Sequence, residues 1–366
     1  MAGAGRHTEH PWSIAARLML FALAMALPVA SVRADTHTWN GAGVDENWGT
    51  AANWSGATPS AGDTLTFNGG TRLTPFNNFA SGSVFAGITF GSAASSFALA
   101  GNTFTLAGDI INSSANPQTL SLGFNLSSNA TRTVNATNGD ITVSGAIHEI
   151  GTCFLSKQGA GKLTLAGNNG YSGGTIVAGG TLSVGSDGMG VHNLGAISAF
   201  CALTLAGGTL EITGDLFGAG TNWLLRDVRL GPGGGTIINA AATPLYIGRE
   251  GYSGFAETIT GGTPANGLTT RGGDIILRPR DQNTLGRLTI AAGRTFLRTD
   301  HGNPFPVAAA DEIVVAGGAT LGFTDHTPRS PTNRITFAPG ANITTRPHVD
   351  YPGAVRLSTA RASFPA

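Results

Sequence analysis

The residues of this sequence that could do chemistry are few and scattered. Gly170-Tyr171-Ser172-Gly173-Gly174 matches the G-x-S-x-G pattern in which a serine is the nucleophile of a hydrolase. That chemistry requires a strand before the serine and a helix after it, whereas Thr175-Ile176-Val177 is typical of a strand. We therefore predict that Ser172 is not a nucleophile, and we predict no catalytic residue elsewhere.

The histidines that follow residue 34 are not spaced as metal ligands. Metal motifs place histidines two or four positions apart on one element, and that spacing does not occur here. We expect neither a metal nor a cofactor, and we interpret these histidines as surface residues. They are His37, His148, His192, His301, His326 and His348.

Three tryptophans, Trp39, Trp48 and Trp54, lie close together near the start of the chain. Aromatic planes on a β-surface could stack on sugar rings, which makes these residues a candidate glycan-stacking site. The alternative is that they cover the apolar interior at the open end of a repeat fold, where an exposed strand edge needs protection. We favour the capping interpretation.

A second group of residues combines guanidinium and carboxylate side chains. Polysaccharide lyases and hydrolases use such groups in catalysis, with an arginine as the base or with two aspartates as the acid and the base. Solvated ion pairs are the simpler interpretation, but a carbohydrate-active enzyme stays open as an alternative. The residues concerned are Arg271, Asp274, Arg278, Arg280 and Asp281.

The composition narrows the fold to the all-β class. The chain has 366 residues, of which 55 are Gly, and 11% are charged with a net charge of zero. A nucleic-acid-binding protein carries a basic excess, so we expect no nucleic-acid partner. Gly costs about 1 kcal/mol relative to Ala inside a helix, which disfavours helices, and 41% hydrophobic residues suffice for a core.

Residues 1–34 have the pattern of a secretory signal peptide. Arg6 and Arg17 precede the apolar run 18–27, and small residues follow up to Ala34. The run is shorter than the ~20 apolar residues of a transmembrane helix, and no comparable segment follows. We expect cleavage after Ala34 or Ala30, no integral membrane segment thereafter, and a secreted or bacterial cell-surface location.

Charge is distributed unevenly along the remaining chain. Residues 35–225 contain ten acidic and four basic residues, whereas residues 226–366 contain ten acidic residues and fourteen arginines. An anionic polymer could bind the second half. A β-surface merely decorated with arginine explains the asymmetry equally well.

Short alternating strings recur at a nearly constant step of about 20 residues, which fits one coil of a solenoid. Each string is rich in Thr, Val, Ile, Leu or Phe and is bounded by turn residues. The strings begin at Thr103, Leu122, Ile141, Leu163, Thr181 and Leu203, with looser matches at Leu65, Ile88, Thr236, Ile275, Leu288, Ile313 and Ile335.

The fold class that we predict is all-β, a right-handed parallel β-helix with a capped N-terminal end. We divide it into a Trp-containing cap with the first strands (35–85), a regular β-helix (86–225) and an Arg-richer, less regular continuation (226–366), with up to about 16 coils in all. A β-sandwich or barrel built from hairpins is the competing fold.

The two cysteines, Cys153 and Cys201, are too far apart in the sequence to fall on one coil or on adjacent coils. With ~20 residues and ~4.8 Å per coil they would be about 10 Å apart along the axis, beyond the ~7 Å Cα separation that a disulfide allows. We expect two separate thiols rather than a bridge.

Residues 155–185, LSKQGAGKLTLAGNNGYSGGTIVAGGTLSVG, closely resemble the autotransporter-associated β-strand repeat, also called the passenger-associated transport repeat. Gly170 stands where that family commonly has Thr, and Ala202–Gly214 and Gly317–Thr324 look like partial copies. Residues 38–70 resemble the opening of exported bacterial proteins with this repeat. The matching positions are Lys157, Gly159, Gly161, Leu163, Leu165, Gly167, Asn169, Tyr171, Gly173, Thr175, Gly180, Thr181 and Leu182.

The resemblance implies an exported or surface-displayed passenger whose repeat assists folding and movement across the outer membrane. We expect a non-enzymatic scaffold or adhesin-like protein, with cell-surface or extracellular polysaccharide as the candidate partner. The tail after residue 350 shows neither translocator strands nor a sorting helix, so a short secreted protein and a truncated chain both stay open. A calcium-stabilised adhesin is disfavoured, because no Gly-Gly-x-Gly-x-Asp array occurs.

Overall fold

The computed structural model describes residues 34–188, 191–197, 201–216, 222–247, 258–277, 284–299, 312–325, 334–345 and 362–363. The chain divides into two units, Met1–Ala34 and Asp35–Ala366. The predicted signal peptide lies outside the described residues except for Ala34. Over the described ranges, no helix is long and apolar enough to cross a membrane.

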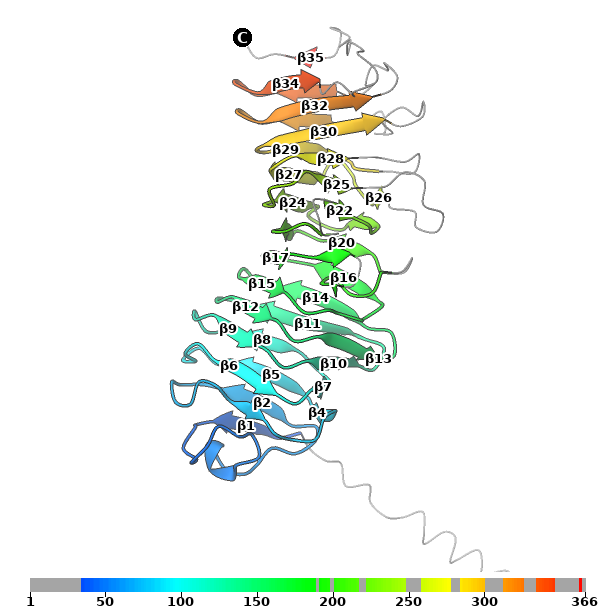
Figure 1. The fold of residues 1–366 in the computed structure, drawn as a ribbon. Coiled ribbons are helices and arrows are strands. Elements are labelled where there is room, and N and C mark those ends of the chain that lie inside the picture. Colours follow the sequence, from blue (N-terminus) through cyan, green and yellow to red (C-terminus); the bar gives the residue numbers. More distant parts are fainter. Residues whose placement is uncertain are drawn as a thin grey trace, which may run out of the picture. The chain divides into compact units, whose positions relative to one another are not determined.

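The second unit is a stack of coils built from parallel strands (Figure 1). Two long sheets run through it, which we call sheet one and sheet two. Sheet one contains ten strands, in the order β1 (Thr36–Trp39), β2 (Thr64–Phe67), β5 (Gly87–Phe90), β8 (Ile110–Asn112), β11 (Thr131–Ala136), β14 (Phe154–Gln158), β16 (Gly174–Val177), β20 (Leu203–Leu205), β23 (Val228–Leu230) and β26 (Ile259–Thr260).

Sheet two contains thirteen strands and is the longest sheet among the described residues. Its strands follow one another as β3 (Phe76–Asn77), β6 (Ala98–Gly101), β9 (Gln118–Leu120), β12 (Ile141–Val143), β15 (Lys162–Leu165), β17 (Thr181–Val184), β21 (Thr209–Ile212), β24 (Gly235–Asn239), β27 (Leu268–Gly272), β29 (Leu288–Ile290), β31 (Glu312–Val315), β33 (Arg334–Phe337) and β35 (Ala362–Ser363).

The third position in the coil, after a sheet-two strand, is filled by two separate sheets. The first contains β4 (Ser83–Phe85), β7 (Phe104–Leu106), β10 (Phe124–Ser127) and β13 (Ile147–Ile150). The second contains β22 (Asn222–Leu224), β25 (Leu245–Ile247), β28 (Ile275–Leu277), β30 (Arg294–Thr299), β32 (Thr320–Asp325) and β34 (Asn342–Thr345). We call these two sheets the third face.

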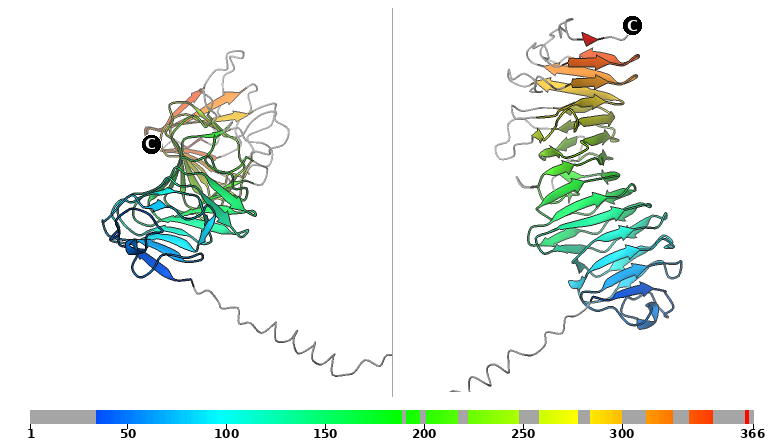
Figure 2. Two further views of the ribbon diagram at one scale, coloured as in Figure 1. Left: turned by 60° about the horizontal axis from the view of Figure 1, so that its bottom comes forward. Right: turned by 180° about the vertical axis from the view of Figure 1, so that it is seen from behind.

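Besides an antiparallel bridge between Trp39 and Trp54, two elements depart from this parallel pattern. A short antiparallel hairpin pairs β18 (Asp187–Gly188) with β19 (Val191–His192). A single 3-10 turn, η1, covers Ala51–Asn53. All pairings between coils in the described ranges are parallel, so the predicted parallel β-helix is confirmed (Figure 2, right).

The core contains inward columns of mostly aliphatic side chains, one from each coil. Each fully buried Val, Leu or Ile contributes about 1.5–3 kcal/mol relative to exposure. Successive strands pair in register, so each side chain packs on its counterparts above and below. One column of sheet two runs Ile141, Leu163, Leu182, Leu210 and Ile237, and one of sheet one runs Leu65, Ile88, Ile110, Val134, Lys157, Val177, Leu205 and Leu230.

The strings identified in the sequence all form strands, but they do not lie on one face. Leu163 pairs with Leu182 in sheet two, whereas Leu203 belongs to sheet one and pairs with Thr175. The sequence step therefore mixes strands of different sheets.

The coils also differ in length more than the sequence step suggests. Leu163 pairs with Leu182 and Leu182 pairs with Leu210, so each of these two segments advances the chain by one coil. The second segment is the longer, because it includes the β18–β19 hairpin. Long coils of this kind explain why sheet two holds thirteen strands, fewer than the number of coils expected from a uniform step.

Buried amide side chains close the corners between sheets. Asn112 is fully buried, and its Nδ2 donates to the carbonyl oxygens of Asn116 at 3.0 Å and of Asp140, in the next coil, at 3.2 Å. Its Oδ1 accepts the N–H of Ser114 at 3.0 Å. Asn239 repeats this pattern with Thr243, Asp274 and Ala241. Each corner amide thus hydrogen-bonds backbone N–H and C=O groups that are not paired with another strand. Buried polar groups need such partners.

Candidate functional site

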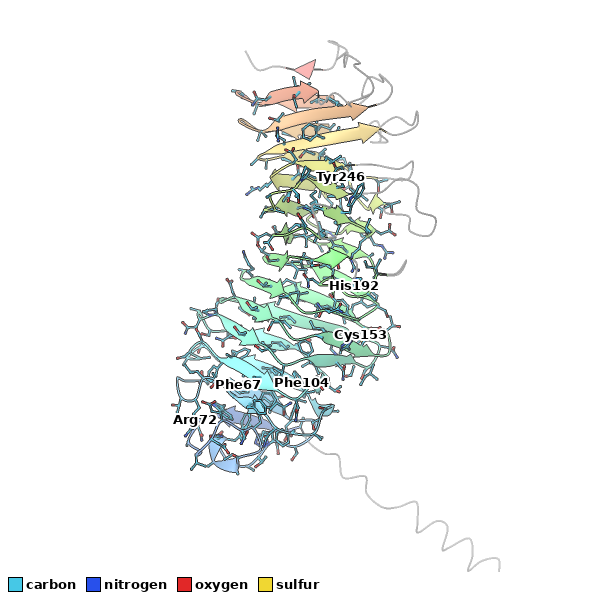
Figure 3. The ribbon with its side chains drawn as sticks, in the orientation of Figure 1. Phe67, Arg72, Phe104, Cys153, His192 and Tyr246 are labelled. Atoms are coloured by element: carbon cyan, nitrogen blue, oxygen red, sulfur yellow. The ribbon has the colours of Figure 1, made fainter. Side chains whose placement is uncertain are left out.

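The third face is interrupted in the coils that carry the repeat motif. Among the described residues it ends at β13 and resumes at β22. Between these strands, residues 166–173 connect β15 to β16, and the segment that contains the β18–β19 hairpin connects β17 to β20. Cys153 and His192 are labelled at this level in Figure 3. We call this interval the break.

The motif glycines permit close stacking of corners on one another. Gly180 has φ +57°, and a Cβ there would lie 2.5 Å from the carbonyl oxygen of Gly161 and closer still to that of Gly159. Only glycine adopts this conformation without steric cost. A Cβ at Gly159, Gly161, Gly167 or Gly173 would likewise strike backbone of the coil before it.

Lys157 lies in the inward column of sheet one, opposite Val134 and Val177. Its side chain is fully buried. The Nζ donates to three carbonyl oxygens, those of Gln158 at 2.7 Å, Gly159 at 2.9 Å and Gly179 at 3.1 Å. Burial lowers the pKa of Lys157 to about 8, with a partial offset from the Asp140 carboxylate. The ammonium therefore ties the corner of its own coil to the corner of the next.

The remaining leucines of the motif, and Thr181, lie in the paired strands β15 and β17. Leu163, Leu165 and Leu182 are fully buried in the core. Thr181 is half-buried on the outer face and pairs with Lys162 of the preceding coil and Thr209 of the next. These positions serve stacking and present no group for chemistry.

Asn169 and Tyr171 close the first coil of the break in place of a third-face strand. The Oδ1 of Asn169 accepts the N–H of Ile147 at 2.9 Å, and its Nδ2 donates to the carbonyl oxygen of Asn193 at 2.6 Å. The hydroxyls of Tyr171 and Thr175 are hydrogen-bonded at 2.7 Å. Burial raises the pKa of the fully buried Tyr171 hydroxyl, so this hydroxyl stays neutral and works as a packing and hydrogen-bonding group.

Ser172 has the surroundings of a structural residue. Its hydroxyl donates to the Oε1 of Glu149, and the Oε2 of Glu149 accepts the N–H of Cys153 at 2.7 Å. The strand β16 follows it, not a helix. The expectation that Ser172 is not a nucleophile fits this context, since the exposed turn of a hydrolase needs a helix after the serine.

Cys153 and Cys201 are buried and are not joined in a disulfide, and the Sγ of Cys201 donates to the carbonyl oxygen of Ser172 at 2.8 Å. Phe154 pairs with Gly174, and the next residue of that strand, Thr175, pairs with Leu203. The two cysteines are therefore two coils apart, about 10 Å at ~4.8 Å per coil, with Gly173 at the intermediate level. Separate thiols agree with the expectation from the sequence.

The three tryptophans are buried, with exposed fractions of 1% for Trp39, 0% for Trp48 and 2% for Trp54. None of the three rings is exposed enough to stack on a sugar, so we do not include these tryptophans in the proposed function. Asn40 and Ser55 donate their N–H groups to Asn53 and Thr38, both at 2.8 Å, which brings residues 53–55 alongside β1. The N-terminal cap stays a prediction.

The arginine and aspartate group is dispersed in the part that the structure describes. Arg271 is exposed, and Asp274 forms an ion pair with Arg294 at 2.6 Å. Arg278, Arg280 and Asp281 lie outside the described residues. No cluster of three or more His, Cys, Asp or Glu side chains that could hold a metal occurs among the residues described.

The histidines differ from the surface interpretation at one position. His37 is mostly buried, and its Nε2 lies 3.0 Å from the Oδ2 of Asp63. The Asp63 carboxylate also accepts the N–H groups of Asp35 and Ser60. The imidazole of His37 is therefore held at this corner by a polar partner rather than by solvent. His148 is exposed and His192 half-buried, whereas His301, His326 and His348 lie outside the described residues.

Asp187 and Arg226 form a buried ion pair at the break that could not be identified from the sequence. Their side chains are 1% and 2% exposed and form an ion pair at 2.6 Å. They are 39 residues apart in sequence, and neither belongs to the repeat motif. A local pattern could not have identified them, because their contact depends on how long the intervening coil is.

Gly180→Ala should destabilise the protein by at least about 2 kcal/mol, because it forces a left-handed backbone and a Cβ against two carbonyl oxygens. Gly179→Ala is the matched control, since its Cβ would meet the nearest atom at 3.6 Å, and it should change stability by less than about 0.5 kcal/mol. Denaturant unfolding of both variants measures this. Equal effects would contradict the corner-stacking role.

The stability difference between the wild type and Lys157→Met should grow in favour of the wild type as pH rises from about 8 to 10.5. Over that interval the unfolded chain keeps a proton that the native state, with its lowered pKa, has released. The slope should approach about 1.4 kcal/mol per pH unit and vanish below pH 8. Guanidinium unfolding at a series of pH values measures it, and a flat difference would contradict the lowered pKa.

The comparisons with known proteins identify the motif-bearing segment. Residues 155–184 match the family model for the Passenger-associated-transport-repeat, which confirms the resemblance of this segment. A curated relative, the Adhesin BmaC autotransporter of Brucella suis biovar 1 (strain 1330), is 32% identical over 159 residues, covering 40% of this chain and 4% of the relative.

The chain thus spans only a small part of that relative's length. No solved structure matches this chain. The fold and the comparisons together describe a parallel β-solenoid in which residues 155–184 match the passenger-associated transport repeat.

Proposed function

We propose that this protein is exported and acts outside the cytoplasm as a non-enzymatic scaffold or adhesin-like passenger. The observation that carries the proposal is the in-register stack of parallel coils with a passenger-associated transport repeat inside it. The partial similarity to an autotransporter adhesin supports the same role.

Coil stacking supplies the driving force for folding after export. A single coil cannot satisfy its own strand hydrogen bonds, so each coil becomes stable when it stacks on the one before. Every added coil buries inward side chains such as Leu163, Leu182 and Leu210. When folding proceeds from one end, each added coil therefore lowers the free energy of the chain and opposes its return to an unfolded state.

Four carboxylates of the described residues have partners other than a second carboxylate. A glycoside hydrolase needs two carboxyl groups facing each other at roughly 5–9.5 Å. Here the carboxylates of Asp63, Glu149, Asp187 and Asp274 instead meet neutral or cationic partners, namely His37, Ser172, Arg226 and Arg294. These four pairings support a scaffold rather than a carbohydrate-active enzyme.

The partner class that we propose is an anionic extracellular or cell-surface polysaccharide. On the outer face of sheet two, Glu312 lies between Arg287, at 3.4 Å, and Arg334, at 3.7 Å. The side chains of the two arginines are 49% and 74% exposed. Two arginines share one carboxylate, which leaves excess positive charge, and guanidinium groups pair well with the carboxylates or sulfates of such a polymer.

Export is tested by expressing the full chain with a C-terminal epitope tag in a bacterial host. We expect the tagged chain outside the cytoplasm, in the medium or accessible to protease on intact cells, since residues 1–34 have the pattern of a signal peptide. A chain that lacks residues 1–34 is the control and should stay in the cytoplasm. Retention of the full chain in the cytoplasm would refute the proposal.

Polysaccharide binding is tested with the secreted chain and immobilised polygalacturonate. The double variant Arg287→Gln/Arg334→Gln should bind about tenfold more weakly, a loss of ~1.4 kcal/mol. Arg229→Gln, which removes an exposed arginine from sheet one, is the matched control and should bind like the wild type. Equal binding by all three proteins would exclude this surface as the binding site.

A further inference from the structure

The break in the third face separates two blocks of coils. The first block carries β4, β7, β10 and β13 on its third face, and the second carries β22 and the strands that follow it. Sheets one and two continue through the break by way of β16 and β20, and of β17 and β21. Within the described ranges, one face in three therefore lacks parallel strand pairing at this level. Isolated backbone hydrogen bonds join the coils there instead, such as the bond from the N–H of Gly170 to the carbonyl oxygen of Ile147 at 2.8 Å.

Arg226 fills this gap from the second block. It lies between β22 and β23, and all five of its N–H donors are engaged. Nε and Nη2 bind the carboxylate of Asp187 at 2.6 and 2.8 Å. The other donors reach the carbonyl oxygens of Gly195, Ala196 and Cys201 at 2.6, 3.2 and 3.2 Å. One side chain thus fixes both ends of the segment between β17 and β20.

Asp187 belongs to the β18–β19 hairpin that replaces a third-face strand. Its Oδ1 also accepts the N–H of Leu194 at 3.1 Å. The same segment rests on the repeat motif, because the N–H of Ala196 donates to the carbonyl oxygen of Tyr171 at 2.9 Å. A Cβ on Gly195 would lie 2.7 Å from the Tyr171 ring. The ion pair is therefore connected through the hairpin segment to the repeat coil, whose strand β14 pairs with β11 of the first block.

We propose that the Asp187–Arg226 ion pair is a latch that couples the two blocks, so that they fold and unfold as one unit across the break. Stability of a solenoid is approximately a sum of coil stabilities and nearest-neighbour interfaces. A weak interface lets the two sides unfold separately, and the latch strengthens the interface that lacks a strand. This inference does not depend on where the protein acts or on what it binds.

The latch also imposes an order on folding. Asp187 and Arg226 are 39 residues apart, and β20, β21 and β22 lie between them in sequence. The hairpin segment acquires its five hydrogen bonds only when the coil that begins with β20 has stacked and delivered Arg226. Until then Asp187 has no cationic partner, and a carboxylate cannot be buried without one except at high cost. The hairpin segment of the break therefore reaches its final structure only after the first coil of the second block has folded.

Hydrogen exchange at increasing guanidinium concentration, read by mass spectrometry, tests the latch. Peptides from β9–β12 report on the first block and peptides from β24–β29 on the second. In the wild type both sets should open with one midpoint. In Arg226→Met the second block should open first, because the described part of sheet one ends there at β26. The two guanidinium midpoints should then differ by at least about 0.5 M.

Asp187→Asn is a milder second variant, because it removes the charge and keeps one oxygen for Arg226. It should separate the midpoints in the same direction by a smaller amount. Lys162→Met is the matched control. It breaks the ion pair between Lys162 and Glu211, which joins β15 to β21 across the same coils at 2.7 Å but is 40% and 19% exposed. Screened surface pairs contribute little, so this variant should keep one common midpoint.

Three outcomes would overturn the latch. The wild type could already show two midpoints, both charge variants could shift the two blocks together, or Lys162→Met could separate them as much as Asp187→Asn does. If Arg226→Met does not fold, the comparison of the wild type, Asp187→Asn and Lys162→Met decides the question alone.

Discussion

Parallel, in-register stacking of successive coils is the constraint on which the rest of this structure depends. Each strand completes its backbone hydrogen bonds only with the coil before and the coil after, so every residue meets its own counterpart at the next level. Leucine therefore packs on leucine inside, as at Leu163 and Leu182, and threonine follows threonine outside, as at Thr181 and Thr209. Corners obey the same rule, since a carbonyl oxygen of one coil occupies the space that a Cβ at Gly180 would need.

The class of fold could be predicted from the sequence because its signals are local. Alternation, turn residues and a nearly constant step are readable within the length of a single coil, and each string identified forms a strand. The face on which a strand lies is not readable in this way. The string LTL at Leu163 and the same string at Leu203 lie in different sheets, because the length of the corners between them decides the face and no residue in the string records it.

The candidate site, like the fold, could be predicted only as far as local sequence signals reach. The motif indicated which glycines, leucines and asparagine matter, but the role of Lys157 was not visible, because a lysine in an alternating strand gives no sign that it points inward among three carbonyl oxygens. The tryptophans posed the reverse problem, since aromatic spacing fits both a sugar platform and a buried cluster. Asp187 and Arg226 were beyond any local pattern, because their contact exists only after the intervening coil has stacked.

Stacking also explains why charge is scarce and where it remains. Like charges at one outward position would lie ~4.8 Å apart on successive coils and repel each other, and only 11% of the residues are charged. Where charges share a column of sheet two, they alternate in sign, as in Arg287, Glu312 and Arg334. The other arrangement is the buried pair of Asp187 and Arg226 at the level where a strand is missing. In both cases opposite charges are paired, between successive coils of sheet two and at the break between Asp187 and Arg226.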